Sequence, residues 1–288
     1  MHPPVQTFNP TPSMPRLALP AGACDSHVHV FGPAAVFAFD DSRNFTPADA
    51  PKETLFALHR QLGISRCVIV QSAIHGFDNR AVEDAIAAGE GRYLGVALAP
   101  HDVPDEELQR LKAAGFRGVR FNFMKHLSPA ATPEQVMALA HRLASLGMHL
   151  QVHFQSDLVH SLAPLLRASP VPIVIDHIGR VDASLGADGA DFVALFALMA
   201  EPHLWMKVSG IDRIDPTPPY TAGIALARRL VKAYPDRCVW GTDWPHPNHT
   251  HVPDDGQLVD ALAQIAPTPA SMQQLLVDNP QRLYQFPT

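Results

Sequence analysis

The chain has 288 residues, of which 47% are hydrophobic and 17% charged, and its formal net charge is −6. This composition is typical of a soluble globular protein that is long enough for one large core. The sequence contains no basic stripe of the kind that binds nucleic acid, and no apolar run approaches the roughly 20 residues that cross a bilayer. The N-terminus lacks the features of a signal peptide, and the three cysteines (Cys24, Cys67 and Cys238) are too widely spaced for a disulfide framework. We therefore expect a cytoplasmic protein with reduced thiols that binds neither nucleic acid nor a membrane.

Residues 1–20 are rich in proline and predict an extended N-terminal arm. After the arm, short apolar and β-branched runs alternate with segments of helical periodicity. Two clear helical segments cover 106–115 and 133–147, and the second ends at a glycine, which is a typical C-terminal cap. A last helical segment over 271–286 predicts a cap over the core. The predicted strands cover 23–30, 66–71, 93–99, 118–123, 149–154, 172–177, 204–209 and 237–243.

Strands that alternate with helices predict a parallel sheet, and eight such units predict an α/β protein with a closed (β/α)8 barrel, the TIM barrel, over residues 21–288. A doubly wound open sheet is the alternative architecture. It lacks its main sequence signal, because no G-x-G-x-x-G motif follows any of the predicted strands. We therefore expect a single catalytic domain, and the sequence leaves the choice between a monomer and a homo-oligomer open.

Polar side chains stand at the C-terminal ends of most predicted strands, where (β/α)8 enzymes carry their active sites. His27 and His29 are two residues apart, so they share one face of the first strand. A single histidine at a strand end is more often structural than functional, and an H-x-H pair can arise by chance in a chain with 16 histidines. The combination is what indicates function. The imidazole and carboxylate groups at strand ends are those of His27, His29, His153, His177 and Asp243.

These groups suit two kinds of chemistry. Imidazoles and a carboxylate that converge in a barrel mouth can hold one divalent ion, such as Zn²⁺ or Mn²⁺, and leave one position open for water. Without a metal, Asp243 can take a proton from water while imidazoles polarise a carbonyl oxygen. Arg120, Arg180 and Arg213 indicate an anionic substrate, because a guanidinium binds a carboxylate through two hydrogen bonds.

Four segments, "CDSHVHVFGP", "GVRFNFMK", "PIVIDHIGR" and "CVWGTDWPHPN", resemble the 2-pyrone-4,6-dicarboxylate hydrolases, lactonases of the amidohydrolase superfamily. The likeness runs through most of the chain, and the same branch includes sulfomuconolactone hydrolases and sugar lactonases. The resemblance implies a (β/α)8 barrel that hydrolyses a lactone ester to the ring-opened acid. It also implies roles in the site for His27, His29, His177 and Asp243. The substrate contacts that it implies are Arg120, Arg180 and Arg213.

Three positions depart from the pattern of the pyrone-dicarboxylate hydrolases. The resemblance to those enzymes implies catalysis without a metal. His153 stands where those enzymes have Tyr, and metal-dependent branches of the superfamily use His at this strand end. His126 replaces a carboxylate-binding Arg, and Phe45 replaces a substrate-binding Tyr. These changes favour a metal-assisted lactonase with a somewhat different substrate, which we expect to be contacted by Phe45, Ser72 and His126 as well as by the arginines.

The leading prediction is a hydrolase for a small, anionic, carboxylated lactone in aromatic-compound or sugar-acid breakdown. In this prediction Asp243 deprotonates water and later returns the proton to the leaving oxygen. The four strand-end histidines stabilise the oxyanion, either directly or through a divalent ion. The alternatives are a metal-dependent decarboxylase of the same superfamily, a lactone isomerase, and a small-acid binding protein on an inactive barrel.

Overall fold

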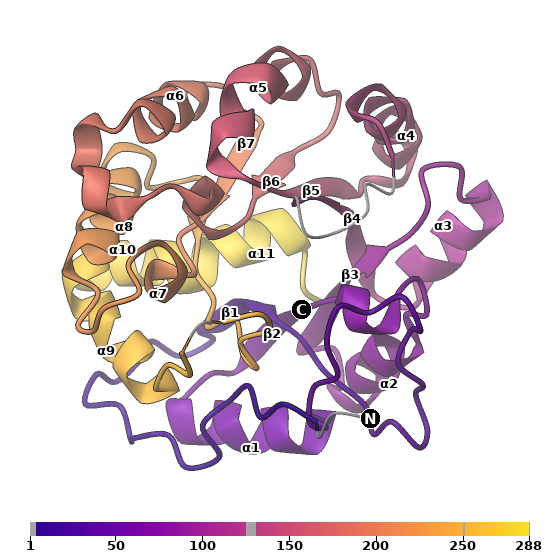
Figure 1. Cartoon of the computed structure of the whole chain (residues 1–288), viewed down its shortest axis with the longest axis horizontal. Coiled ribbons are helices and arrows are strands. Elements are labelled where there is room, and N and C mark those ends of the chain that lie inside the picture. The colour runs from indigo at the N-terminus through magenta and orange to yellow at the C-terminus, as the bar shows by residue number, and fades with distance from the viewer. Residues whose placement is uncertain (1–3, 125–130, 250, 288) are drawn as a thin grey trace.

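The computed structural model describes residues 4–124, 131–249 and 251–287. Eight parallel strands follow one another around the sheet in chain order, and helices surround them (Figure 1). This arrangement confirms the (β/α)8 barrel and excludes the doubly wound sheet, in which the strand order reverses. The strands are β1 (Cys24–Val28), β2 (Arg66–Val70), β3 (Tyr93–Leu98), β4 (Phe116–Phe123), β5 (His149–Phe154), β6 (Ile173–Ile175), β7 (Leu204–Lys207) and β8 (Cys238–Val239).

The barrel closes where the chain beyond β8 returns to β1. Three backbone hydrogen bonds of 2.7–2.8 Å join residues 26–29 to residues 240–244. Gly241 lies at this seam, where a Cβ atom would stand 2.5 Å from the backbone nitrogen of His27. A side chain at this position would push the two segments apart, so the close approach needs glycine. The seam therefore brings the histidines of β1 next to the residues that follow β8.

Helices pack around the barrel, and the two clearest predicted ones are confirmed. The helix predicted over 133–147 begins after a capping box at Thr132 and ends at Gly147, whose backbone is left-handed at φ 61°. The helices are α1 (Lys52–Leu62), α2 (Arg80–Ala88), α3 (Asp105–Ala113), α4 (Pro133–Leu146), α5 (Val159–Arg167), α6 (Ala190–Leu198), α7 (Ile211–Ile214), α8 (Thr221–Ala233), α9 (Asp255–Ile265), α10 (Pro269–Gln273) and α11 (Asn279–Tyr284).

The C-terminal segment covers the end of the barrel where the strands begin. Tyr284 and Phe286 are buried in one apolar cluster with Cys24 at the start of β1 and Trp205 near the start of β7. Arg117, near the start of β4, donates a hydrogen bond of 3.0 Å to the backbone oxygen of Tyr284. The opposite end of the barrel, where the strands finish, is thereby left as the place for a polar site.

Residues 4–20 form no helix and run along the surface of the barrel. Arg16 forms an ion pair of 2.9 Å with Asp260 on α9. Phe8 is buried, and its ring centroid lies 5.1 Å from that of Trp244. The arm therefore packs against the loop that follows β8. None of the helices in the described part of the chain has the length and apolar character needed to span a membrane.

Strands β6, β7 and β8 are shorter than the sequence predicts. His177 and Asp243, expected at the ends of β6 and β8, lie beyond those strands with φ of 50° and 67°. A left-handed residue turns the chain out of the extended path, so the hydrogen-bonded ladder ends before it. The apolar runs predict where the strands begin. They do not predict where the strands end, because residues with left-handed backbone, such as His177 and Asp243, continue the strand pattern in the sequence.

Candidate active site

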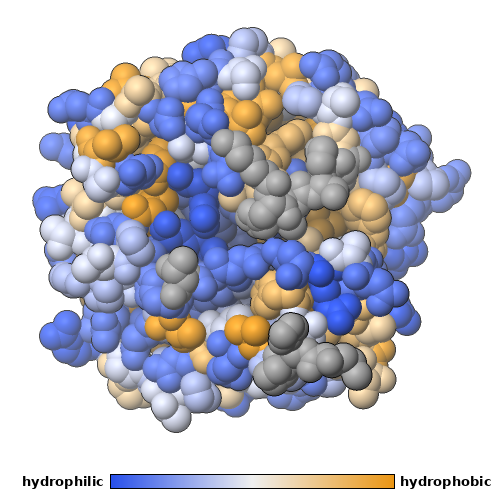
Figure 2. Space-filling model, viewed as in Figure 1, coloured by the Kyte–Doolittle hydropathy of each residue, from blue (hydrophilic) through white to orange (hydrophobic). Residues whose placement is uncertain are grey.

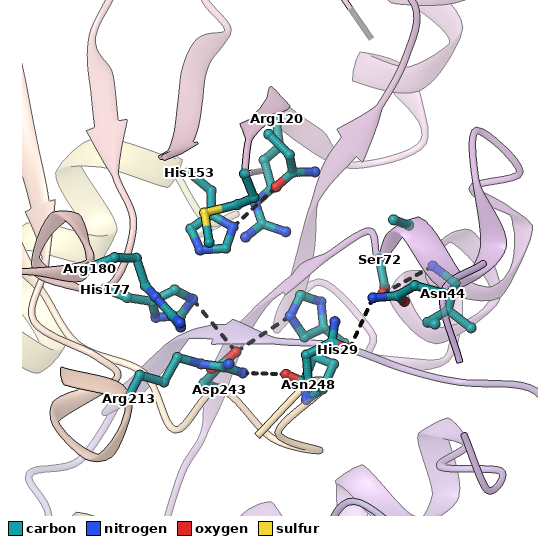
Figure 3. Close-up of a pocket in the computed structure, with 15 residues that line it drawn as sticks. His29, Asn44, Ser72, Arg120, His153, His177, Arg180, Arg213, Asp243 and Asn248 are labelled. Atoms are coloured by element: carbon teal, nitrogen blue, oxygen red, sulfur yellow. Dashed lines mark hydrogen bonds and ion pairs between the residues drawn. The ribbon is translucent and has the colours of Figure 1, made fainter. Parts of the chain in front are cut away.

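A cavity opens at the C-terminal ends of the strands. Figure 2 shows a hollow with a hydrophilic lining near the middle of the face in view. The cavity lies over β1 and the loops after β6 and β8, and its lining side chains converge from several strands (Figure 3). The lining residues that the sequence predicts are His29, Ser72, Arg120, His153, His177, Arg180, Arg213 and Asp243.

Three other predicted residues do not line this cavity. His27 is fully buried beside Asp243, below the cavity floor. Phe45 packs against the hydrophobic core, and its neighbour Asn44 lines the cavity instead. His126 lies outside the described residues.

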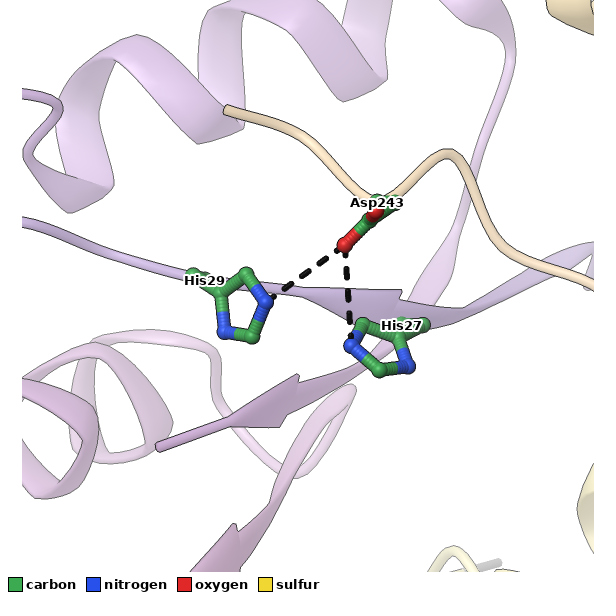
Figure 4. A group of neighbouring side chains, drawn as sticks. All are labelled: His27, His29 and Asp243. Atoms are coloured by element: carbon green, nitrogen blue, oxygen red, sulfur yellow. Dashed lines mark ion pairs between the residues drawn. The ribbon is translucent and has the colours of Figure 1, made fainter. Parts of the chain in front are cut away.

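Asp243 is the centre of the site (Figure 4). Its Oδ1 atom faces the Nε2 atoms of His29 at 3.5 Å, His27 at 3.7 Å and His177 at 3.8 Å. Its Oδ2 atom forms an ion pair with the guanidinium of Arg213. Burial alone would raise the pKa of Asp243, but Arg213 and the imidazoles outweigh burial and hold this pKa well below its ordinary range. The carboxylate is therefore ionised at neutral pH.

The hydrogen bonds of His29 fix where its proton lies. Nδ1 of His29 is 2.7 Å from the backbone oxygen of Val70, which can only accept, so Nδ1 carries the proton. Burial lowers the pKa of His29, so the ring is neutral and Nε2 carries a lone pair. This lone pair faces the carboxylate oxygen of Asp243, which has no hydrogen-bond partner among the described residues. Two acceptors in this arrangement need a cation or a water proton between them.

The spacing of these atoms fits a divalent ion. Two ligand atoms that lie about 2.1 Å from Zn²⁺ at a tetrahedral angle are about 3.4 Å apart. The measured separations from Asp243 Oδ1 are 3.5–3.8 Å, and the nearest ligand atoms of His27, His29 and Asp243 all lie within 4.8 Å of one another. The donor set, with imidazole nitrogens and one carboxylate oxygen, is the one that Zn²⁺ takes in hydrolytic sites.

Beneath these residues lies a buried polar layer that the sequence analysis missed. Lys207 is fully buried, and its Nζ atom lies 2.8 Å from Gln151 Oε1, 3.2 Å from His27 Nδ1 and 3.5 Å from Asp176 Oδ1. Asp176 Oδ2 accepts hydrogen bonds from Arg120 at 2.8 Å and from Gln151 at 3.1 Å. Burial lowers the pKa of Lys207 to about 8. The layer holds His27 in place below Asp243.

A lysine in the middle of the apolar run "LWMKVS" is the signal that would have found Lys207, because an unpaired lysine does not fit inside a barrel. Asn44, Asn122 and Asn248 also line the cavity, and the sequence analysis assigned a role to none of them. Amides in loops or at strand ends are common in turns and at helix caps, so they carry no comparable signal.

His153 lines the cavity at the end of β5, apart from the group around Asp243. Its Nδ1 atom lies 3.2 Å from Asn122 Oδ1, and its buried Nε2 atom has no hydrogen-bond partner in the described parts of the chain. Burial, and then the charge of Arg120, hold the pKa of His153 well below its ordinary value. His153 belongs to no group of three described side chains whose ligand atoms lie within 4.8 Å of one another.

An unusual turn after β6 presents both a histidine and an arginine to the cavity. Residues 177–180 all have positive φ, between 50° and 60°, and three of the four are not glycine. Such backbone is costly for residues with a Cβ atom and is concentrated at functional sites. The turn directs His177 toward Asp243 and places Arg180 at the cavity wall (Figure 3).

The three arginines of the cavity differ in how they are engaged. Arg120 is paired with Asp176, and Arg213 is paired with Asp243 and also donates to the backbone oxygen of Pro247 at 3.0 Å. The guanidinium of Arg180 has no hydrogen bond or ion pair to any residue that the structure describes. Burial, and then the charge of Arg213, lower the pKa of Arg180 to about 10, so it remains a cation at neutral pH.

Imidazoles, a carboxylate and arginines gather at the strand ends of a (β/α)8 barrel. This arrangement is typical of (β/α)8-barrel hydrolases. The amidohydrolase family model matches residues 24–286, and the chain belongs to this family. The chain is 45% identical over 284 residues to the 2-pyrone-4,6-dicarboxylate hydrolase of Comamonas testosteroni, with 95% of this chain and 93% of the relative covered. The resemblance predicted from the sequence is therefore confirmed.

Two further relatives agree with this assignment. The chain is 40% identical over 274 residues to the 4-sulfomuconolactone hydrolase of Hydrogenophaga intermedia, with 93% of this chain and 90% of the relative covered. The crystal structure of an Agrobacterium tumefaciens protein in its apo form superposes with a TM-score of 0.84 at 27% identity, over 95% of this chain and 99% of that one.

Replacing Lys207 with methionine tests the buried layer. We expect Lys207→Met to lower the free energy of unfolding by about 1–3 kcal/mol, because Gln151 Oε1 and His27 Nδ1 lose a buried hydrogen-bond donor and Asp176 loses an ion pair. Equilibrium urea unfolding measures this change. Lys232→Met on the exposed face of α8 is the matched control and should change little. Equal or higher stability of Lys207→Met would contradict the role given to this lysine.

Proposed function

We propose that this enzyme hydrolyses the ester bond of a small carboxylated lactone and releases the ring-opened acid. The observation that carries the proposal is that an ionised buried carboxylate and an arginine with no partner among the described residues face the same cavity. Asp243 is suited to take a proton from water, and Arg180 is suited to bind a substrate carboxylate. The relatives named for 2-pyrone-4,6-dicarboxylate and 4-sulfomuconolactone support this class of substrate, since both names describe anionic lactones.

The hydrolysis begins with a water molecule between Asp243 Oδ1 and His29 Nε2. Both atoms accept hydrogen bonds, so they engage the two water protons and leave an oxygen lone pair free to attack the lactone carbonyl. Asp243 takes one proton as the carbon–oxygen bond forms. Arg213 on Oδ2 keeps the carboxylate ionised until that moment. When the ring ester bond breaks, Asp243 returns the proton to the leaving oxygen.

We also propose, as the alternative to this metal-free arrangement, that the site works with one divalent ion, which would take the lone pairs of Asp243 Oδ1 and His29 Nε2 that otherwise accept the water protons. His27, His29, His177 and Asp243 would hold it, and when bound it would polarise the carbonyl oxygen and lower the pKa of water toward about 7. His27 can serve as a ligand because its Nε2 atom lies 3.7 Å from Asp243 Oδ1 and has no hydrogen-bond partner among the described residues, while Lys207 donates to Nδ1 at 3.2 Å and holds the ring in place. His153 is then left for the substrate side of the cavity, together with Arg120, Arg180 and Ser72.

The other reactions open to these groups give different products. A decarboxylase would release CO₂ without opening the lactone, and an isomerase would move the ester without adding water. The charges in the cavity favour ester hydrolysis of an anionic substrate. A carboxylated lactone supplies the carbonyl that water attacks, and its carboxylate supplies a counter-ion for Arg180. Acid release in a pH-indicator assay, with identification of the product by mass, separates the three reactions.

Replacing Asp243 with asparagine tests the proposed base. We expect Asp243→Asn to lower kcat on a carboxylated lactone by about 10²–10⁴-fold, the range that a general base contributes. A pH-indicator assay measures kcat, and circular dichroism checks that the variant is folded. The matched control is Asp102→Asn at an exposed position, which should retain full turnover. Turnover of Asp243→Asn near that of the wild type would rule out this residue as the base.

Replacing Arg180 with glutamine tests the proposed carboxylate contact. Loss of a charge-assisted hydrogen bond costs about 1.5–3 kcal/mol, so we expect KM for a carboxylated lactone to rise about 10- to 150-fold. The kcat/KM for an uncharged lactone should change little, because that substrate has no carboxylate for Arg180 to bind. Arg228→Gln on the exposed face of α8 is the control. An equal loss on both substrates would show that Arg180 does not select the carboxylate.

A further inference from the structure

A second cluster of metal-ligating side chains lies beside the active site. Asp212 belongs to α7, and His249 and His251 belong to the loop that follows β8. Their nearest ligand atoms all lie within 4.8 Å of one another. None of the three lines the active-site cavity, and none was singled out in the sequence. The cluster is therefore separate from the group around Asp243.

No residue that the structure describes satisfies the buried carboxylate of Asp212 with a hydrogen bond. Asp212 is 1% exposed, and neither of its oxygens accepts a hydrogen bond in the described portion of the chain. Nε2 of His249 lies 3.0 Å from Oδ2 of Asp212, but the pair does not have hydrogen-bond geometry. A buried carboxylate is costly unless it is paired or binds a cation. A nitrogen and an oxygen that are close but not aligned for an N–H···O bond are suited to share a cation.

The third side chain is held in position by a tyrosine. Nε2 of His251 lies 3.2 Å from the hydroxyl of Tyr220, at the start of α8. Nδ1 of His251 is buried and has no hydrogen-bond partner within the described ranges. A ring nitrogen fixed by an outer partner, with the other nitrogen left free, is the usual arrangement of a histidine that binds a metal.

We propose that Asp212, His249 and His251 form a second site for a divalent transition-metal ion, with Zn²⁺ the expected occupant. Two imidazoles and one carboxylate match the ligand preference of Zn²⁺ and are too few oxygens for Ca²⁺ or Mg²⁺. The site joins α7 to the loop after β8. This inference does not depend on the reaction that the enzyme catalyses.

The ion would stabilise the part of the active site that holds Arg213. Arg213 follows Asp212 directly on α7, and it donates to the backbone oxygen of Pro247 in the same loop that carries His249. A metal that joins Asp212 to this loop therefore fixes both Arg213 and Pro247, the two residues that this hydrogen bond connects. Its role is structural, because none of its ligands lines the cavity.

Metal analysis of variants tests this site. Protein stripped with a chelator is dialysed against Zn²⁺ alone, and bound zinc is measured by elemental analysis. We expect Asp212→Asn and His249→Gln each to lose one equivalent of zinc relative to the wild type and to lose the rise in Tm that this zinc produces. His160→Gln, which breaks an exposed His–Asp pair of 2.9 Å, is the matched control and should bind as much zinc as the wild type.

The Asp243→Asn variant separates this site from the one at the centre of the barrel. It should retain the equivalent of zinc that Asp212→Asn loses, whether or not Asp243 proves to be the catalytic base. If the Asp212 and His249 variants do not fold, anomalous scattering at the zinc edge from wild-type crystals gives the answer. A peak between Asp212, His249 and His251 supports the site. Unchanged zinc content in both variants, or no such peak, overturns it.

Discussion

The constraint on which the site depends is a carboxylate buried at the seam of the barrel. Asp243 is fully buried, and it remains ionised because Arg213 and three imidazoles surround it. This position exists only because β8 ends early and the chain turns back against β1, where Gly241 permits the close approach. Closing the barrel and assembling the site are therefore one event, since the backbone bonds that join residues 26–29 to 240–244 also bring His27 and His29 to Asp243.

Charge is the basis of the proposed substrate selection. Two buried carboxylates, Asp176 and Asp243, are matched by Lys207, Arg120 and Arg213, and Arg180 is left as a cation that pairs with no residue the structure describes. A buried unpaired charge is costly, and an anionic ligand removes that cost when it binds. The layer beneath the cavity serves a different purpose, because Lys207, Gln151 and Asp176 hold His27 and do not themselves line the cavity.

Much of this arrangement follows from the sequence, for reasons that are physical. Apolar runs alternating with helical segments predict the eight strands, and the polar residues after them predict the cavity lining, because parallel strands all end on one side of a barrel. The turn at 177–180 could not be predicted, since its left-handed backbone has no signature apart from Gly179. Phe45 was expected to contact substrate, but its side chain packs against the core and its neighbour Asn44 lines the cavity. Loop sequence does not show which of two adjacent side chains faces the cavity. The close approach of Asp212 and His249 could not be predicted either, because it depends on contacts between segments far apart in the chain.

Turnover in water labelled with ¹⁸O tests the central claim most directly. The enzyme is incubated with a carboxylated lactone in H₂¹⁸O, and the product is examined by mass spectrometry. Attack by a water that Asp243 activates places one ¹⁸O atom in the newly formed carboxylate and opens the ring. A product with no label, or one that has lost CO₂ while the lactone remains closed, would contradict the account.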